Sequence, residues 1–172
     1  MISEEIKQYL VKVCTILNSH NVEYLVVGGA AVSHYGFNRA SRIGQHNSNL
    51  KADLDFWYNP TVENYQNLVR ALDELTVDTS DLKKLVFDKK RTFLKIPHED
   101  FHTDFLPVME GLDSFRSANA KAEVIDISGV PLRVLSYDDL IKNKRAVNRK
   151  TDQSDIAELD KIRKGRGRGK AI

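Results

Sequence analysis

The chain has little cysteine, little net charge and no long hydrophobic run. Its one cysteine, Cys14, excludes a disulfide within the chain and suits a reducing cytosol; its apolar neighbours indicate a small core side chain. The formal net charge is only +2 over 172 residues, so global charge does not require a nucleic-acid partner. No apolar run approaches the length of a membrane span, and the N-terminus is acidic, so we expect a cytoplasmic protein with no membrane partner.

The composition is otherwise that of a folded domain. Hydrophobic residues make up 41% of the chain and charged residues 29%, and the chain is long enough to bury one core. Mixed helix and strand patterns predict an α/β (α+β) fold with a core over residues 1–135 and a packed helical part over residues 136–163. Lysine or arginine alternates with glycine from Lys161 to Lys170, so we expect no structure there and a basic, flexible tail over residues 164–172. Such a tail would contact RNA or another polyanion, or would only aid solubility.

Two carboxylates with a single residue between them lie in an apolar, aromatic run over residues 51–57, which predicts a strand. Because strand side chains alternate, Asp53 and Asp55 share one face and their apolar neighbours share the other. Two like charges held side by side repel each other and lose hydration, which favours a metal ion or a basic partner beside them. Asp104 lies in a second short strand candidate, residues 101–107. Three carboxylates converge if these two strands are neighbours.

A glycine pair, Gly28-Gly29, ends a β-branched run over residues 22–27 and precedes a short helix candidate over residues 30–35. Glycine lets backbone N–H groups approach an anion closely, and the first turn of a helix favours negative charge. The turn would therefore suit a phosphate. Glycine pairs also end strands for purely steric reasons, so both interpretations stand.

The segment over residues 36–49 has no hydrophobic period and predicts a loop. It places Arg39, Arg42 and His46 between the glycine pair and the carboxylate strand, where they would hold polyphosphate or a charged acceptor. The alternative is a solvated, mobile loop.

Hydrophobic periodicity predicts the other elements. We expect helices over residues 3–20 and 81–87, two more helices capped by Thr61 and by Ser136, and a last helix that starts at Thr151 or Asp152. We expect strands over residues 91–96 and 102–106, and a hairpin formed by residues 124–127 and 130–134.

Aromatic and histidine side chains near the carboxylates have simple interpretations. Trp57 and Tyr58 would stack on a base, but such side chains are more often core, which we favour. His98 and His102 flank the Asp104 strand with a spacing that suits zinc only on a helix, so we predict local polar contacts.

In their order and spacing these motifs resemble the nucleotidyltransferase superfamily typified by DNA polymerase beta. Within it they are most similar to minimal and AbiEii-type bacterial nucleotidyltransferases found as toxins in toxin–antitoxin pairs. The likeness covers most of the chain, through residues 25–31, 53–55, 104, 135–144 and 149–156. The chain departs from the pattern at Gly29, where many relatives have serine, and at residues 49–53, which lack the usual arginine and threonine. These departures concern the nucleotide contacts and leave the metal site unchanged.

The resemblance implies a mixed twisted sheet flanked by helices, with a helical C-terminal part. It implies transfer of a nucleoside monophosphate from an NTP to an acceptor, which would be a tRNA, a protein or a small molecule. It also implies a cognate toxin–antitoxin partner. The alternative is a catalytically inactive binding module of the same fold that acts through a protein or RNA partner.

The resemblance also implies roles for particular residues. The metal would be Mg²⁺, as two ions, with Mn²⁺ as an alternative. The metal ligands, which are also catalytic, would be Asp53, Asp55 and Asp104. Lys144 and Asp155 would be further catalytic residues. The nucleotide would be bound by Gly28, Gly29, Arg39, Lys51 and Lys144. In the alternative interpretation, Lys144, Asp152 and Asp155 form an exposed charge cluster of two packed helices.

Overall fold

The computed structural model describes residues 2–37 and 51–168. The predicted nucleotide-binding residue Arg39 lies outside this range, as do Arg42 and His46. None of the helices in the described ranges combines the length and apolar character that crossing a membrane would require.

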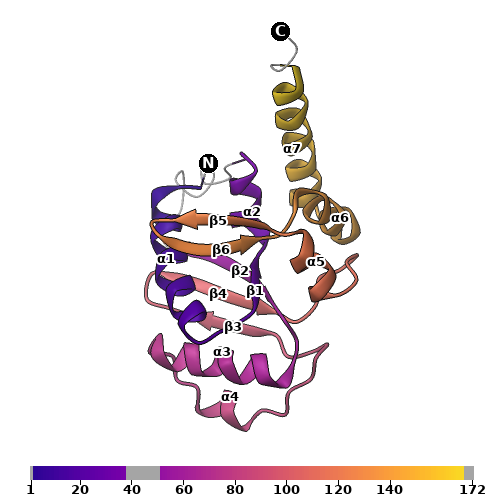
Figure 1. Ribbon diagram of the computed structural model, residues 1–172. Coiled ribbons are helices and arrows are strands. Elements are labelled where there is room, and N and C mark those ends of the chain that lie inside the picture. Colours follow the sequence, from indigo (N-terminus) through magenta and orange to yellow (C-terminus); the bar gives the residue numbers. More distant parts are fainter. Residues whose placement is uncertain (1, 38–50, 169–172) are drawn as a thin grey trace.

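One mixed sheet organises the described part of the chain (Figure 1). Its strand order is β3-β4-β2-β1-β6-β5. The central pair β1/β2 is antiparallel, the pairs β2/β4 and β1/β6 on either side of it are parallel, and the outer pairs β3/β4 and β5/β6 are antiparallel. The strands are β1 (Tyr24–Val26), β2 (Ala52–Tyr58), β3 (Leu94–Pro97), β4 (Phe101–Leu106), β5 (Glu123–Ile127) and β6 (Val130–Val134).

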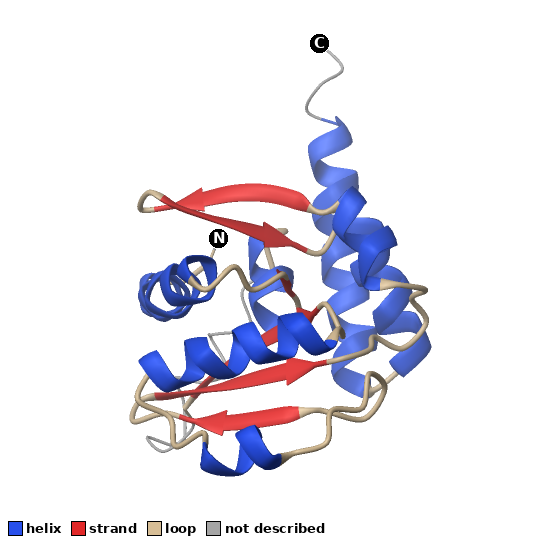
Figure 2. Ribbon diagram, turned by 60° about the horizontal axis from the view of Figure 1, so that its bottom comes forward, coloured by secondary structure: helices blue, strands red, loops and turns tan. Residues whose placement is uncertain are grey.

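Helices cover both faces of this sheet, which confirms the predicted α/β class (Figure 2). α1 packs on α3 and on β6, whereas α2 packs on β2 and on α6, which in turn packs on α7. The helices are α1 (Glu4–Ser19), α2 (Gly28–His34), α3 (Val62–Glu74), α4 (Ser80–Lys84), α5 (Phe115–Lys121), α6 (Tyr137–Val147) and α7 (Lys150–Arg168).

Local sequence signals account for the helix starts and for the hairpin. The hydroxyl groups of Ser3, Thr61 and Ser136 accept hydrogen bonds from backbone N–H groups three residues later, as predicted for N-caps. Ser128 and Gly129 both have positive φ, at 54° and 82°, as a two-residue hairpin turn requires. The β5/β6 hairpin is therefore confirmed.

One layer of the core lies on the side of β2 opposite its carboxylates. Leu54 and Phe56 are fully buried, and Phe56 stacks on Phe105 of β4 with ring centroids 5.2 Å apart. Cys14 is buried as expected, and burial raises the pKa of its thiol to about 12. Over residues 52–56 the alternation of apolar and polar residues thus separates a buried face from the face that carries the carboxylates.

Trp57 and Tyr58 belong to the core, as we predicted. The Trp57 indole N–H donates to the carbonyl of Pro107 over 3.1 Å, and the Tyr58 hydroxyl donates to the carbonyl of Thr92. Both side chains are buried, and these hydrogen bonds satisfy their polar atoms inside the protein.

The expectation of an unstructured segment from Lys161 was wrong as far as Arg168, because α7 continues to that residue without a break at residue 164. Tertiary contacts explain the difference. A Cβ atom built on Gly36 would lie 3.5 Å from Ile162, and the Arg163 guanidinium binds Asp138 and lies over the Tyr137 ring. These contacts stabilise α7 up to Arg163, and the exposed turn with Gly165 and Gly167 extends a helix that is already formed.

Candidate active site

Three carboxylates share one face of the sheet. β2 and β4 are parallel neighbours, and their register places Asp55 opposite Asp104 and Asp53 opposite His102. Asp53 lies two residues from Asp55 on the same strand and therefore on the same face. Asp53 is exposed, while Asp55 and Asp104 are half-buried. The predicted convergence of the two carboxylate strands is confirmed.

Negative charge is concentrated on this face. Burial raises the pKa of Asp104 above its usual value, the charge of Asp53 raises it further, and Lys95 and His102 oppose the shift. Lys95 lies opposite Asp104 on the edge strand β3. Because the carboxylates repel each other and lose hydration, a bound cation would stabilise their ionised forms.

The ionised Asp104 is expected to destabilise the folded protein in the absence of metal, so Asp104→Asn should raise the melting temperature at pH 7 in a chelator. Between the usual pKa of 3.8 and its raised value, the folded protein binds more protons than the unfolded chain. Wild-type stability therefore falls as the pH rises through that window. Melting curves at pH 3.5 and pH 7 test this, since the advantage of the variant should appear only at the higher pH. An equal difference at both values would contradict the expectation.

Gly28 makes room for the Asp55 carboxylate. Its φ of +59° is in the left-handed region that favours glycine, and a Cβ atom built there would lie 2.0 Å from Asp55 Oδ2. Backbone pairing fixes the approach, because the N–H group of Val27 donates to the carbonyl of Asp55 over 3.0 Å. Gly28 therefore does more than end a strand: the lack of a side chain lets the start of α2 pack directly on Asp55.

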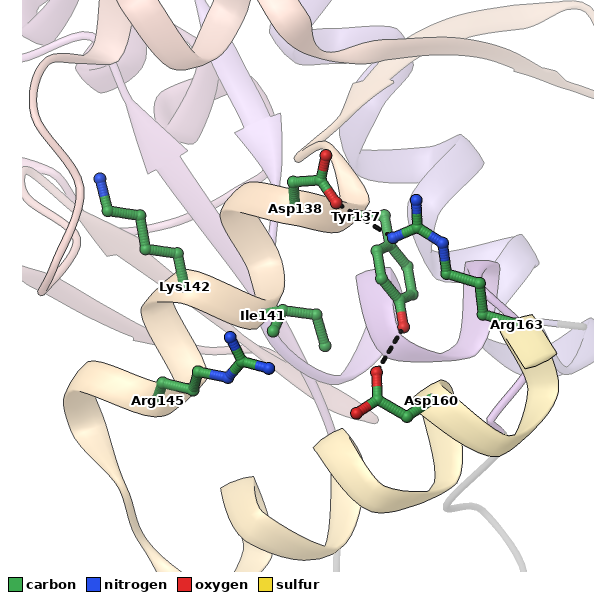
Figure 3. Close-up of a pocket in the computed structure, with 7 residues that line it drawn as sticks. All are labelled: Tyr137, Asp138, Ile141, Lys142, Arg145, Asp160 and Arg163. Carbon is green, nitrogen blue, oxygen red and sulfur yellow. Dashed lines mark hydrogen bonds and ion pairs between the residues drawn. The ribbon is translucent and has the colours of Figure 1, made fainter.

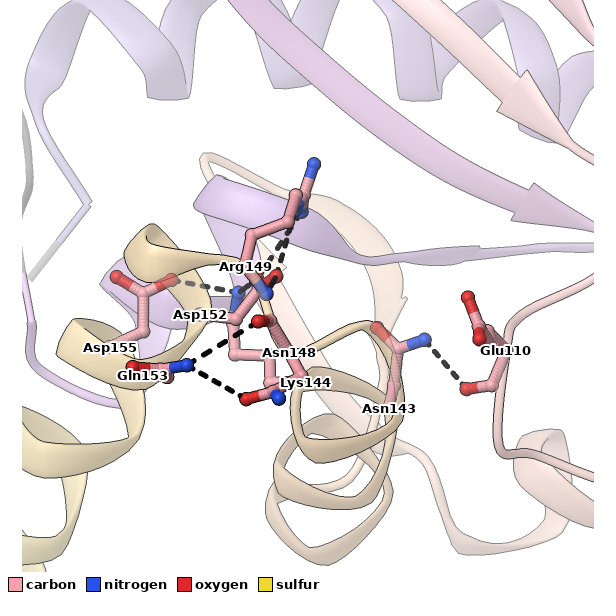
Figure 4. A network of polar contacts seen from close by, with 8 residues as sticks. All are labelled: Glu110, Asn143, Lys144, Asn148, Arg149, Asp152, Gln153 and Asp155. Carbon is pink, nitrogen blue, oxygen red and sulfur yellow. Dashed lines mark hydrogen bonds and ion pairs between the residues drawn. The ribbon is translucent and has the colours of Figure 1, made fainter.

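A buried ionic cluster joins α6 to α7 (Figure 4). Lys144 is only 4% exposed, and its Nζ lies 3.1 Å from Asp152 Oδ1 and 2.7 Å from Asp155 Oδ2. Both carboxylates are buried as well. The three residues do connect two packed helices, but the exposed charge cluster of our alternative interpretation is wrong because all three are inside the protein.

Arg149 is a site residue that our sequence interpretation missed. Its Nε and Nη2 atoms lie 2.8 Å and 3.2 Å from the two oxygens of Asp152. Its pKa is raised first by these hydrogen bonds, against burial, and then by the charges of Asp152, Asp55 and Asp155. Arg149 therefore contacts the buried cluster through Asp152, and the charge of Asp55 on the carboxylate strand also acts on it. The available signal was its place three residues before Asp152.

Asp152 is held in its ionised form. Burial alone would raise its pKa, but hydrogen bonds from Arg149 and Lys144 outweigh burial and lower the pKa to about 2. The carboxylate thus stays charged at neutral pH although it is buried.

The remaining predicted residues have local contacts. The exposed Lys51 Nζ donates to the carbonyl of His98 over 3.0 Å. The His98 ring lies 3.0 Å from the Thr103 hydroxyl and stacks on Phe101, in agreement with the local role that we predicted for it.

The chemistry of the carboxylate face fits a magnesium ion. Among the described residues, no group of three or more histidine, cysteine or acidic side chains is gathered tightly enough to hold a metal ion alone. Magnesium, however, usually binds through one or two carboxylates together with waters and substrate phosphates. Asp55 and Asp104, directly opposite each other, supply that number of ligands.

A separate hollow of about 390 Å³ lies between α6 and α7 (Figure 3). Its wall includes an ion pair between Arg163 and Asp138 and a hydrogen bond from the Tyr137 hydroxyl to Asp160. Asp53, Asp55 and Asp104 do not line it. The hollow is therefore distinct from the carboxylate face.

Comparison with known proteins identifies the fold. No family model matches the sequence, and no curated protein matches it. Among solved structures, a candidate nucleotidyltransferase from Thermotoga maritima superposes with a TM-score of 0.53 at 15% identity, over 98% of this chain and 96% of that one. An antigenic nucleotidyltransferase-like protein from Paracoccidioides brasiliensis gives 0.54 at 16% identity, over 92% and 77%. The lincosamide antibiotic adenylyltransferase LnuA, with lincomycin bound, gives 0.53 at 13% identity, over 94% and 98%. The chain therefore has the nucleotidyltransferase fold.

Proposed function

We propose that the protein is a metal-dependent nucleotidyltransferase that transfers a nucleoside monophosphate from an NTP to an acceptor. The observation that carries this proposal is the pairing of Asp55 with Asp104 across two parallel strands, with Asp53 on the same face. The close packing of Gly28 on Asp55 adds a turn without side chains beside the carboxylates.

Asp53, Asp55 and Asp104 would hold Mg²⁺, as two ions, with Mn²⁺ as an alternative. When bound, the metal lowers the pKa of the attacking hydroxyl group and neutralises charge on the phosphates. The acceptor oxygen attacks the α-phosphorus, the bond to the β-phosphate oxygen breaks, and pyrophosphate leaves. The protein contributes mainly position and charge, because phosphoryl chemistry needs little else from side chains. Backbone N–H groups at Gly28 and Gly29 would face the triphosphate.

The acceptor is a tRNA, a protein or a small molecule. LnuA is named as an adenylyltransferase of lincosamide antibiotics, so small molecules belong in any search for the acceptor. We further propose, from the resemblance of the motifs to AbiEii-type proteins, that the chain acts in a bacterial toxin–antitoxin pair with a cognate partner that controls it.

Label from an α-labelled NTP is expected to enter one fraction of a cell lysate when wild-type protein and Mg²⁺ are present. Asp55→Asn removes one charge from the carboxylate pair, so incorporation should be lost. Asp113→Asn is the matched control, because Asp113 is exposed on the loop after β4, and it should retain activity. The labelled fraction identifies the acceptor class.

The same experiment tests the alternative of an inactive binding module. Transfer by neither the wild type nor Asp55→Asn, with both proteins folded and several divalent metals tried, would contradict the proposed activity. A melting temperature that Mg²⁺ and NTP together fail to raise would support the same conclusion.

A further inference from the structure

Because Lys144 is buried, a different positively charged side chain is needed to contact the phosphates of the nucleotide. Its ammonium group is enclosed at 4% exposure and lies within 3.1 Å of Asp152 and 2.7 Å of Asp155. Contact with a phosphate would require the ammonium group to leave two buried carboxylates, which is costly. The cation that meets the substrate must therefore be nearer the surface.

Arg149 has the exposure and the free donors that such a contact needs. Its side chain is 69% exposed although Asp152, its partner, is buried. The guanidinium group carries five N–H donors, and the Asp152 contacts use two of them. The backbone N–H group of Arg149 also donates to Asp152 over 3.0 Å, so main chain and side chain are anchored to one carboxylate.

Contacts of α6 link the segment that carries this anchored arginine to elements that carry or adjoin the carboxylates. The loop after β4 packs against the second half of α6. Asn143 donates a hydrogen bond to the carbonyl of Glu110, and a Cβ atom built on Gly111 would lie 2.6 Å from Ala146. α6 also packs on α2, which begins at the glycine beside Asp55. Arg149 follows directly after α6, and the charge of Asp55 acts on it.

We propose that Arg149 binds the phosphates of the nucleotide, and that Lys144, Asp152 and Asp155 form a buried support that positions it. This inference rests on the proposed function and names a further residue of the same site. The guanidinium fork matches the geometry of phosphate oxygens and binds them through paired hydrogen bonds. Asp152 fixes one edge of the fork, so little side-chain freedom is lost on binding. The four residues thus form one unit, with one cation buried and the other presented to the ligand.

Binding of labelled NTP in the presence of Mg²⁺, measured by equilibrium dialysis, tests this assignment. Arg149→Ala is expected to weaken NTP binding about 10- to 100-fold, because hydrogen bonds between charged groups are lost. Arg149→Lys keeps the charge and its attraction to Asp152 but loses the fork, so its affinity should fall between those of wild type and Arg149→Ala. The matched control is Lys150→Ala, which removes an exposed positive charge one residue later and should bind as the wild type does.

The outcomes separate this inference from the proposed function. Unchanged NTP affinity in both Arg149 variants, with binding by the wild type intact, overturns the role of Arg149 and leaves the proposed function standing. No NTP binding by the wild type with Mg²⁺ or Mn²⁺ overturns both. Melting curves identify a temperature at which every variant is folded, and binding is measured there. If Arg149→Ala does not fold, the NTP affinity of Arg149→Lys relative to wild type decides the question. Equal weakening by Lys150→Ala would also overturn the inference, since only general charge would then matter.

Discussion

Lys144→Met is expected to lower the free energy of unfolding by about 3–5 kcal/mol, because removing one partner of a buried ion pair leaves the other charge uncompensated. Asp155 loses an ammonium group 2.7 Å away, whereas Asp152 keeps Arg149. For a chain of this size the loss corresponds to a fall in melting temperature of roughly 6–20 °C. Urea denaturation at pH 7 measures the change directly.

Two further variants identify the cause of the Lys144 effect. Lys142→Met changes an exposed lysine on the same helix and should alter stability by less than about 0.5 kcal/mol. The double variant Lys144→Met/Asp155→Leu replaces the buried pair with apolar groups and should recover much of the loss, since such replacements are often neutral. A double variant no more stable than Lys144→Met would contradict an electrostatic cause.

The pH dependence of this cluster follows from Asp152. Its folded pKa of about 2 lies below the usual value of 3.8, so its stabilising contribution is complete above pH 4. The contribution is lost as the pH falls from about 4 towards 2. The difference in stability between wild type and Lys144→Met should therefore narrow over that interval.

Gly28→Ala is expected to abolish most of the transfer activity and to destabilise the protein. The Cβ atom of the new alanine would lie 2.0 Å from Asp55 Oδ2, so the carboxylate or the start of α2 must move. Displacement of a reacting group by about 1 Å costs on the order of a hundredfold in rate. The left-handed backbone adds about 1–2 kcal/mol of strain for any residue with a side chain.

Gly129→Ala separates the two parts of the Gly28 effect. Gly129 also has a positive φ, of +82°, but a Cβ atom built there meets nothing within 4 Å. This variant should lose a similar amount of stability through backbone strain and keep full activity. Full activity of Gly28→Ala would contradict the expectation that close packing of Gly28 on Asp55 is needed for transfer.

Local patterns predicted the parts of the site that depend on one segment. Alternation along residues 51–57 placed Asp53 and Asp55 on one face, and side-chain signals at Ser3, Thr61 and Ser136 predicted three helix starts. Adjacency of β2 and β4 is different, because their segments lie some fifty residues apart and their pairing depends on the whole sheet. Its prediction required the resemblance to a known fold.

Burial was the property that sequence reasoning predicted least well. Lys144, Asp152 and Asp155 are charged, and charged residues are almost never fully buried unless they are paired. The pattern alone therefore left an exposed cluster open as an alternative, and only the packing of α6 on α7 shows that pairing permits burial. Arg149 is exposed, as is usual for a charged residue. The carboxylate that anchors it, Asp152, is buried, and this depends on tertiary structure.

The register between β2 and β4 constrains how this protein can change during evolution. Carboxylates and core residues alternate along both strands, so a one-residue deletion within β2 would turn the later carboxylate inward and a core side chain outward. The carboxylate face and the hydrophobic core would be disrupted by the same deletion. Substitutions can accumulate singly along these strands, whereas changes of length are expected to survive mainly in exposed loops and turns. Homologues should therefore keep the two-residue spacing from Asp53 to Asp55 even where little else is shared.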